Sequence, residues 1–377
     1  MAITNKQLIS SMMKEMSTEF NSRVNLQSMT DREVYELISD YPTLQNEFIS
    51  TLTNKVIKTT FYSKVFENPL RMLHRGKWRF GDSMEQIFVD MAEKKGFHEH
   101  FDGSKSDCED LINVQKPKVH VNYITMNYKY KYKVTISEEQ METAFYNEYG
   151  LSEMVSQILA SLTSGCYQDE FQDTKALLLA VANGQKLIED RKTGLLKAVP
   201  LKDTEVASPL HLEEIDEFET NPKILAEKIK ALTGRLTFAS SKYNMSGVTQ
   251  WSKKDRLIFL TTPEIVAKLD VNVLADAFNV SKAELNIRTI LIDELPGTFL
   301  KALGQNKLSK RTCYGFLFDE DFLQIYDRLL KMAQFGNGAN LTVNHFLHKH
   351  GMFANCYFAN AMAIVGKEIE EINPDSE

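Results

Sequence analysis

The chain has 377 residues, a formal net charge of −7 with histidine neutral, and a hydrophobic fraction of 43%. This length allows roughly two to three domains whose cores need neither disulfides nor metals. The acidic balance argues against nucleic-acid binding along the whole chain, because proteins that hold DNA or RNA by its phosphates usually carry a basic excess. No stretch approaches the ~20 apolar residues that cross a bilayer, and the N-terminus lacks the plan of a secretory signal. We therefore expect that the protein does not associate with membranes and that it is synthesised in a cytoplasm.

The N-terminal 66 residues are polar and favour helices. Asp31 precedes Val34, Leu37 and Ile38 at the spacing of a capped amphipathic helix, and a second helix is predicted from Thr43. The weak periodicity favours an arm rather than a compact domain. From residue 68 to 81 the chain is predicted to be extended, and a short helix is predicted to begin at Asp82 or Ser83. A polar stretch with glycine and proline breakers covers residues 92–118.

The most informative segment covers residues 119–136. Its second half alternates strictly, because Tyr128, Tyr130, Tyr132, Val134 and Ile136 share one face and Lys129, Lys131 and Lys133 share the other. As one strand the segment would be roughly 55 Å long, whereas the expected radius of gyration of the chain is only ~21 Å. The strand therefore either arches across the molecule or projects from it. In the second case another chain must cover the tyrosines, and the lysines guard the edge against indiscriminate pairing. A long strand inside an internal sheet is the alternative.

The remaining elements follow in order. Ser137 and Gln140 form a capping box, and a helix of about 30 residues is predicted from 151 to 183. Residues 191–220 are predicted to be an acidic loop. A helix follows Asn221 and Pro222, and then helices alternate with apolar strands: a strand at 257–260, a helix that starts at Pro263, a helix at 271–278, and strands at 289–292 and 314–318. Apolar C-terminal strands are predicted at 341–346 and 357–365.

We find no motif that carries catalytic or cofactor chemistry: no phosphate loop, nucleophile elbow, zinc-protease motif or paired cysteines. His345, His348 and His350 are clustered, but in a strand His345 faces away from the other two, so we expect no metal site. His98 and His100 lie in a polar loop and receive the same interpretation. Asp319, Glu320 and Asp321 are predicted to form a solvated turn, because they lack the ligand spacing of a calcium loop. We expect no catalytic residue and no cofactor.

Four stretches, in this order, resemble the major capsid protein of the phi29-like podophages. The first joins Asn68-Pro69-Leu70 to Phe80-Gly81 and residues 84–88, and the second runs from Tyr132 through Thr143-Ala144-Phe145 into the long helix. The third is Leu269-Asp270-Val271-Asn272-Val273-Leu274-Ala275-Asp276-Ala277-Phe278-Asn279. The fourth runs from Asp319-Glu320-Asp321-Phe322 through Tyr326-Asp327 and Leu330-Lys331-Met332 to Phe358-Ala359-Asn360-Ala361. Together they extend from about residue 68 to 366.

The resemblance implies an α+β protein with the HK97-like capsid fold of tailed-phage shells. On this basis residues 1–66 would be the N-terminal arm and residues 67–136 an extended loop, a long β-hairpin that reaches over a neighbouring subunit. Residues 137–221 and 341–372 would form the peripheral domain with its spine helix, and residues 222–340 an α/β axial domain. Some relatives append an immunoglobulin-like domain, which we do not expect after Val365. No residues match the Lys–Asn isopeptide crosslink of some shell proteins, and we expect no covalent crosslink.

The expected function is that of a major capsid protein, not an enzyme, which self-assembles into the icosahedral or elongated shell around double-stranded phage DNA. Partners implied by the resemblance are further copies of the chain in pentamers and hexamers, a scaffolding protein and the portal. The DNA would be enclosed without sequence-specific binding, and assembly would take place in the host bacterial cytoplasm before the protein resides in the virion. The predicted inter-subunit contacts are Tyr128, Tyr130, Tyr132, Lys129, Lys131 and Lys133. Two alternatives are a cytoplasmic α/β enzyme with a site in residues 256–326 and a filament-forming adaptor that uses the Tyr/Lys strand.

Overall fold

The protein is described from a computed structural model. The structure describes residues 5–24, 29–41, 66–78, 83–92, 116–137, 150–202, 205–216, 223–276, 287–303, 307–340 and 342–372, and single residues between these ranges (44, 47, 48, 51, 81, 140, 142, 144, 145 and 218). The chain divides into two compact units. Unit 1 contains Met1–Asn68, Lys129–Asp173 and Asp327–Gly351, and unit 2 contains Pro69–Tyr128, Thr174–Tyr326 and Met352–Glu377.

The N-terminal part of unit 1 is a cluster of short helices, α1 (Asn5–Met12), α2 (Thr18–Arg23) and α3 (Asp31–Asp40). Helix α3 is capped as expected, although the N-cap is Thr30, which the sequence pattern did not single out: the Thr30 and Glu33 side chains bond reciprocally to each other's backbone N–H groups. These helices bury apolar residues such as Ile9 and Phe20 in a common core with Phe48, Phe145 and others. These helices thus share a core with residues later in the chain, and the assignment of residues 1–66 to an arm stays a prediction. The helix predicted from Thr43 lies largely outside them.

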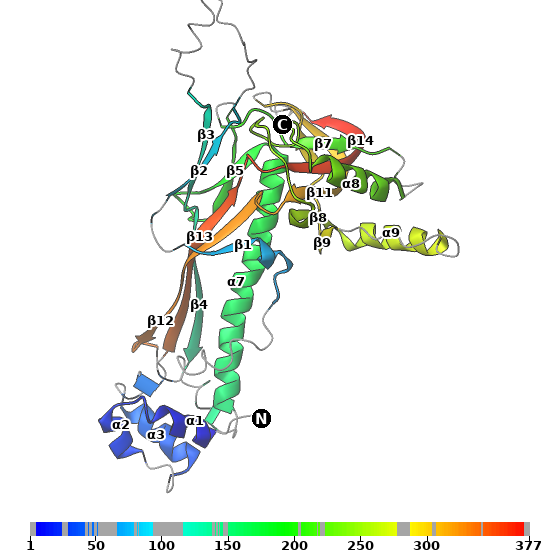
Figure 1. The fold of residues 1–377 in the computed structure, drawn as a ribbon. Coiled ribbons are helices and arrows are strands. Elements are labelled where there is room, and N and C mark those ends of the chain that lie inside the picture. Colours follow the sequence, from blue (N-terminus) through cyan, green and yellow to red (C-terminus); the bar gives the residue numbers. More distant parts are fainter. Residues whose placement is uncertain are drawn as a thin grey trace, which may run out of the picture. The chain divides into compact units, whose positions relative to one another are not determined.

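The second part of unit 1 combines a long helix with a sheet. Helix α7 (Gly150–Ala182) has 33 residues, or about 50 Å, which confirms the predicted spine helix, and its residues up to Asp173 belong to unit 1. In the sheet order β1-β12-β13-β4, strands β12 (Leu323–Asn337) and β13 (Thr342–Asn355) contribute to both units, and β4 comprises Tyr128–Ser137. Leu162 and Cys166 of α7 pack with Leu347 of β13 and Tyr132 of β4, and Figure 1 shows the helix running along these strands.

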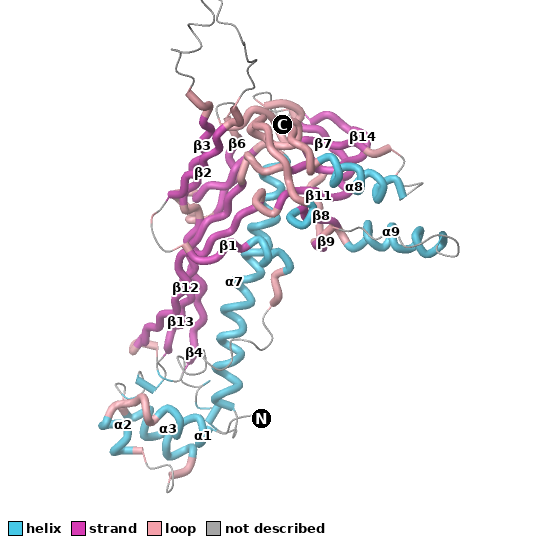
Figure 2. The backbone as a smooth tube through the Cα atoms, in the orientation of Figure 1, coloured by secondary structure: helices cyan, strands magenta, loops and turns pink. Residues whose placement is uncertain are grey.

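Unit 2 is built on a mixed sheet of six strands in the order β7-β14-β11-β8-β9, with β10 paired to β11. Its strands are β7 (His211–Glu214), β8 (Leu257–Thr261), β9 (Arg288–Leu291), β10 (Thr298–Leu300), β11 (Leu308–Asp319) and β14 (Ala361–Ile372). The central strand β11 is antiparallel to β8 and β14, whereas β8–β9 and β14–β7 are parallel pairs. Helices α8 (Lys223–Arg235) and α9 (Pro263–Asp276) accompany the sheet (Figure 2), and α8 buries Leu225, Ile229 and Leu232 against it.

The rest of unit 2 consists of two-stranded ribbons and short elements. β2 (Ser83–Val89) pairs with β3 (Val119–Thr125) over seven antiparallel positions, and β5 (Gln185–Glu189) pairs with β6 (Leu196–Pro200). The short elements are η1 (Pro69–Leu73), β1 (His74–Lys77) and η2 (Lys254–Arg256). The cap at Ser137 and the apolar strands of β8, β9, β11, β13 and β14 confirm their predictions.

Four sequence-based expectations about elements are wrong. Residues 83–89 form strand β2 instead of a helix, because Met84, Gln86 and Phe88 alternate inward and pair with β3. The run 119–136 is not one strand, because Met126 and Asn127 separate β3 from β4. The acidic loop at 191–220 contains β6 and β7, and the helices expected at Pro263 and at 271–278 form the single helix α9. The predicted four-part domain division stays a prediction.

Candidate inter-subunit surfaces

The two faces of the β2–β3 ribbon differ in burial. On one face Phe88 stacks on Phe358 with ring centroids 5.7 Å apart, and Met84 and Ile124 pack with Met352. The other face is apolar but open to solvent. We call it the β2–β3 apolar face, and it consists of Ile87 (61% exposed), Val89 (51%), Val119 (51%), Val121 (42%) and Tyr123 (66%).

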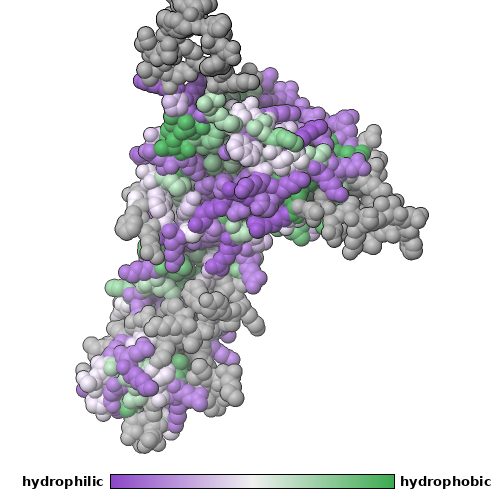
Figure 3. Space-filling model, in the orientation of Figure 1, coloured by the Kyte–Doolittle hydropathy of each residue, from purple (hydrophilic) through white to green (hydrophobic). Residues whose placement is uncertain are grey.

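The pairing of the ribbon makes this face continuous. Val89 lies opposite Val119 and Ile87 opposite Val121, and Tyr123 follows across from Glu85. Directly opposite side chains in an antiparallel pair lie within about 5.5 Å of each other, so the five residues form one patch. Figure 3 shows hydrophobic side chains gathered over this ribbon. An apolar patch of this kind, with the reverse side of the ribbon packed inside the unit, is a candidate for a contact with another molecule.

The tyrosines of β4 are already covered by their own chain. Tyr128 is 1% exposed and packs on Phe353 at a ring distance of 4.7 Å, while Tyr132 belongs to the cluster with Leu162 and Cys166 of α7. Tyr128 and Tyr132 thus have apolar partners within their own chain, whereas contact of the three tyrosines with another subunit stays a prediction. Lys129, Lys131 and Lys133 are exposed on the opposite face as expected. Their contact with another subunit stays a prediction.

Burial between β4 and α7 shifts the pKa values of side chains on both elements. Burial raises the pKa of Asp173, at the α7 side, to about 6, although the hydrogen bond from Tyr130 favours the charged form and Asp169 disfavours it. Burial likewise raises the pKa of Tyr132, and nearby Cys166 and Asp169 act in the same direction. These side chains hold β4 against the helix in a partly dehydrated setting, so the strand is positioned from within the unit.

The acidic turn after β11 is ion-paired instead of merely solvated. Arg75 binds Glu320 (Nη1–Oε1, 3.0 Å) and Asp321 (Nη2–Oδ1, 2.6 Å), and Arg256 pairs with Asp321 and, at 3.5 Å, with Asp319. Guanidinium groups thus occupy the carboxylates that a cation would need, which corrects the expectation of a solvated turn. The arginines come from distant parts of the sequence, so spacing alone could not reveal the cluster.

The histidines of β13 follow the predicted alternation. His345 is 2% exposed, and burial lowers its pKa, whereas His348 and His350 lie on the other, half-buried face. His98 and His100 lie outside the described residues. Among the cysteines, Cys166, Cys313 and Cys356 are free thiols, and burial raises the pKa of Cys313 to about 12, so it is an inert core residue. Cys108 lies outside the described residues.

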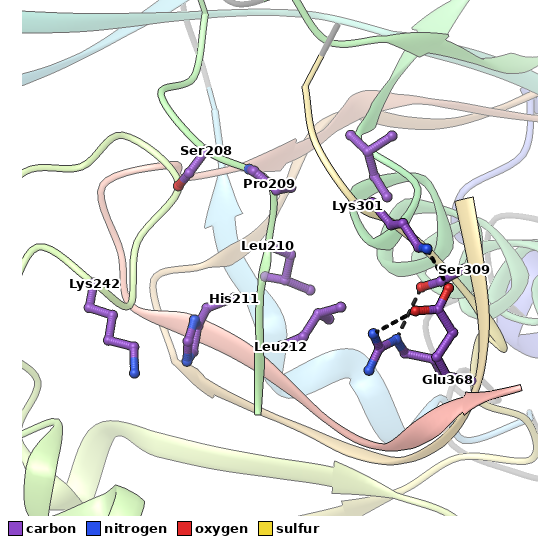
Figure 4. Close-up of a pocket in the computed structure, with 11 residues that line it drawn as sticks. Ser208, Pro209, Leu210, His211, Leu212, Lys242, Lys301, Ser309 and Glu368 are labelled. Carbon is purple, nitrogen blue, oxygen red and sulfur yellow. Dashed lines mark hydrogen bonds and ion pairs between the residues drawn. The ribbon is translucent and has the colours of Figure 1, made fainter. Parts of the chain in front are cut away.

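A cavity of about 480 Å³ lies beside strands β7 and β11 in unit 2. Figure 4 shows His211, Lys301 and Glu368 among its lining residues. The Lys301 ammonium lies 2.5 Å from a Glu368 carboxylate oxygen, and Arg311 contacts both Glu214 and Glu368. These cations already have carboxylate partners, so we assign no ligand to the cavity. None of the helices in the described parts of the chain is long and apolar enough to cross a membrane.

Comparison with solved structures defines the fold. A chain from the capsid structure of Staphylococcus phage Andhra superposes with a TM-score of 0.57 and 16% identity, over 82% of this chain and 87% of that chain. A chain from the structure of the head fibre and inner core protein of native bacteriophage P68 gives a TM-score of 0.56 and 15% identity, over 81% and 86%. The fold is therefore the HK97-type fold of phage capsid proteins.

Sequence comparison identifies the family of the chain. The profile described as Phi29-like phage major capsid protein matches residues 9–365, and the chain belongs to this family. It is 29% identical to the major capsid protein of Bacillus phage GA-1 over 92% of this chain and 66% of that protein, and 27% identical to that of Streptococcus phage Cp-1 over 85% and 83%. The chain thus spans slightly less than two thirds of the length of the GA-1 protein. The comparisons support neither the enzyme nor the adaptor alternative.

Proposed function

We propose that this chain is the building block of a phage head and acts by self-association, not by catalysis. Its copies form pentamers and hexamers that close into an icosahedral or elongated shell. The β2–β3 apolar face is the observation that carries the proposal. Five apolar side chains stand exposed on one face of a ribbon whose other face is packed, which is a costly arrangement for a protein that remains alone.

The contact pairs this apolar face with a neighbouring subunit, as the resemblance to shell proteins with a projecting loop implies. Lys129, Lys131 and Lys133 are proposed to contact an acidic surface of a neighbouring subunit from the edge of the sheet. The tyrosines act indirectly: Tyr130 and Tyr132 hold β4 to α7, Tyr128 packs on Phe353 of β13, and together they set where the lysines point. Each contact can be weak, because a closed shell repeats it in every subunit.

The chain encloses double-stranded DNA without reading its sequence. A net charge of −7 supports this role, because an inner wall with little positive charge does not retain DNA as it is driven inward. A scaffolding protein and the portal are the further partners that the resemblance implies, and assembly takes place in the bacterial cytoplasm before the protein resides in the virion.

The test is the assembly state of the purified chain. Sedimentation velocity over a concentration series, alone and with the scaffolding protein from the same phage, should reveal capsomers or shells, and electron microscopy should show fivefold and sixfold particles. Open filaments would favour an adaptor instead. A monomer at all concentrations in both conditions would overturn the proposal.

A further inference from the structure

Unit 1 contains a buried polar cluster that joins three distant parts of the sequence. The two carboxylate oxygens of Glu170, on α7, have different partners: Oε1 accepts a hydrogen bond from Asn68 Nδ2 at 3.0 Å, and Oε2 pairs with Lys349 Nζ of β13. Asn68 is 7% exposed, Glu170 3% and Lys349 4%. One carboxylate thus holds an amine and a carboxamide side by side, away from solvent.

The surroundings keep the amine in this position. Asp327 Oδ1 lies 3.8 Å from Lys349 Nζ, and the Tyr167 ring centroid lies 5.8 Å from it. A buried ammonium–carboxylate pair carries a large desolvation cost, and moving the proton to the carboxylate removes both charges from the site. Proton transfer within this pair leaves a neutral lysine amine, which is a nucleophile, beside a carboxylic acid, which is a proton donor.

We propose that Lys349 and Asn68 become joined by an intrachain isopeptide bond, with Glu170 as the catalytic acid–base. Glu170 accepts a proton from the Lys349 ammonium, and the neutral Nζ attacks Cγ of Asn68. Glu170 then transfers this proton to the leaving Nδ2, the Cγ–Nδ2 bond breaks, and ammonia departs. Glu170 takes up the second proton of Nζ and ends as the carboxylic acid, which leaves a neutral amide. The new bond is Nζ–Cγ, and no oxidant or other reactant is consumed. The Asn68 carboxamide needs no separate activating group, because Glu170 holds the two reacting side chains close together.

The residue after Asn68 prevents the reaction that usually competes for an asparagine side chain. An asparagine side chain is commonly attacked by the backbone nitrogen of the next residue, which forms a succinimide. Here the next residue is Pro69, which has no backbone N–H to provide this nucleophile. Asn68 therefore keeps its carboxamide for Lys349. The proposal revises the expectation of no covalent crosslink, which rested on the absence of matching residues in the sequence, and it does not depend on shell assembly.

The intact mass of the full-length purified chain tests the bond. Loss of ammonia lowers the mass by about 17 Da relative to the mass calculated from the sequence. Trypsin should also fail to cleave at the modified Lys349, so a peptide of residues 65–71 should appear joined to one of residues 332–367. A wild-type chain with its full calculated mass and separate peptides would overturn the proposal.

Variants separate this bond from other modifications. Lys349→Arg keeps the charge but should show the full mass, and Asn68→Asp should lose water, about 18 Da, instead of ammonia. Glu170→Gln keeps both reacting groups and should show the full mass, with circular dichroism to confirm folding. Asn337, which precedes Gly338 in a turn, is a position where a succinimide would give the same loss of about 17 Da. Persistence of that loss in Lys349→Arg would therefore refute the isopeptide assignment.

Discussion

The β2–β3 apolar face makes a quantitative prediction for shell assembly, with Ile87→Asp as the perturbation. Ile87 is 61% exposed, and burying a whole isoleucine side chain contributes about 1.5–3 kcal/mol, so its burial at a contact contributes about 1–2 kcal/mol. Aspartate loses this contribution and places a charge in an apolar contact. Since about 1.4 kcal/mol corresponds to a factor of ten in an equilibrium constant, we expect the threshold concentration for assembly to rise at least tenfold.

The assay is sedimentation velocity over a concentration series, with electron microscopy of the fast-sedimenting fraction. Leu195→Asp is the matched control, because Leu195 is 59% exposed and lies outside the β2–β3 apolar face. The control should assemble at the wild-type threshold, and both variants should unfold within about 0.5 kcal/mol of wild type, as exposed substitutions do. An unchanged threshold for Ile87→Asp would refute the assignment of this face to a contact. Equal impairment by the control would refute its specificity.

Three further predictions concern stability and the lysine edge. Gly315→Ala should lower the free energy of unfolding, measured in urea, by about 1–3 kcal/mol, because a Cβ there would lie 2.7 Å from the Leu260 carbonyl oxygen. The control is Gly165→Ala, in helix α7 with open space around it, which should leave the free energy of unfolding unchanged or raise it. Burial raises the pKa of Asp173 to about 6 from 3.8, so the folded state binds a proton between these values and loses stability as pH rises through them. Asp173→Asn should therefore stabilise by up to about 3 kcal/mol above pH 7 and give no gain below about pH 4, and a pH-independent difference would contradict this. Reversing the charge of all three exposed lysines of β4 should raise the assembly threshold most at low salt, and an equal threshold in low and high salt would contradict a charged contact.

Local sequence patterns predicted an element correctly where the residues that determine it lie close together in the sequence. The apolar period of α7, the fully buried strand β8 and the capping box at Ser137 each depend on residues within a few turns, and the structure confirms them. The order of four stretches along the chain was also sufficient to indicate the family.

Patterns failed where a partner far along the chain decides the outcome. Met84, Ile87 and Met91 fit a helical spacing, yet pairing with β3 makes β2 a strand. The tyrosines of β4 looked unpartnered because the sequence does not show that α7 lies beside them.

The same distinction between local and long-range determinants applies to the proposed functional surfaces. The sequence determined an acidic chain with a lysine face on one strand, because charge and alternation are local properties, and the resemblance of four stretches to the phi29-like family implied the HK97-type architecture. Only the tertiary structure decided that one face of the β2–β3 ribbon stays open, that arginines neutralise the turn after β11, and that Glu170 holds Asn68 and Lys349 together. These features join residues up to 281 positions apart, and no local rule specifies which distant side chains meet once the backbone has folded.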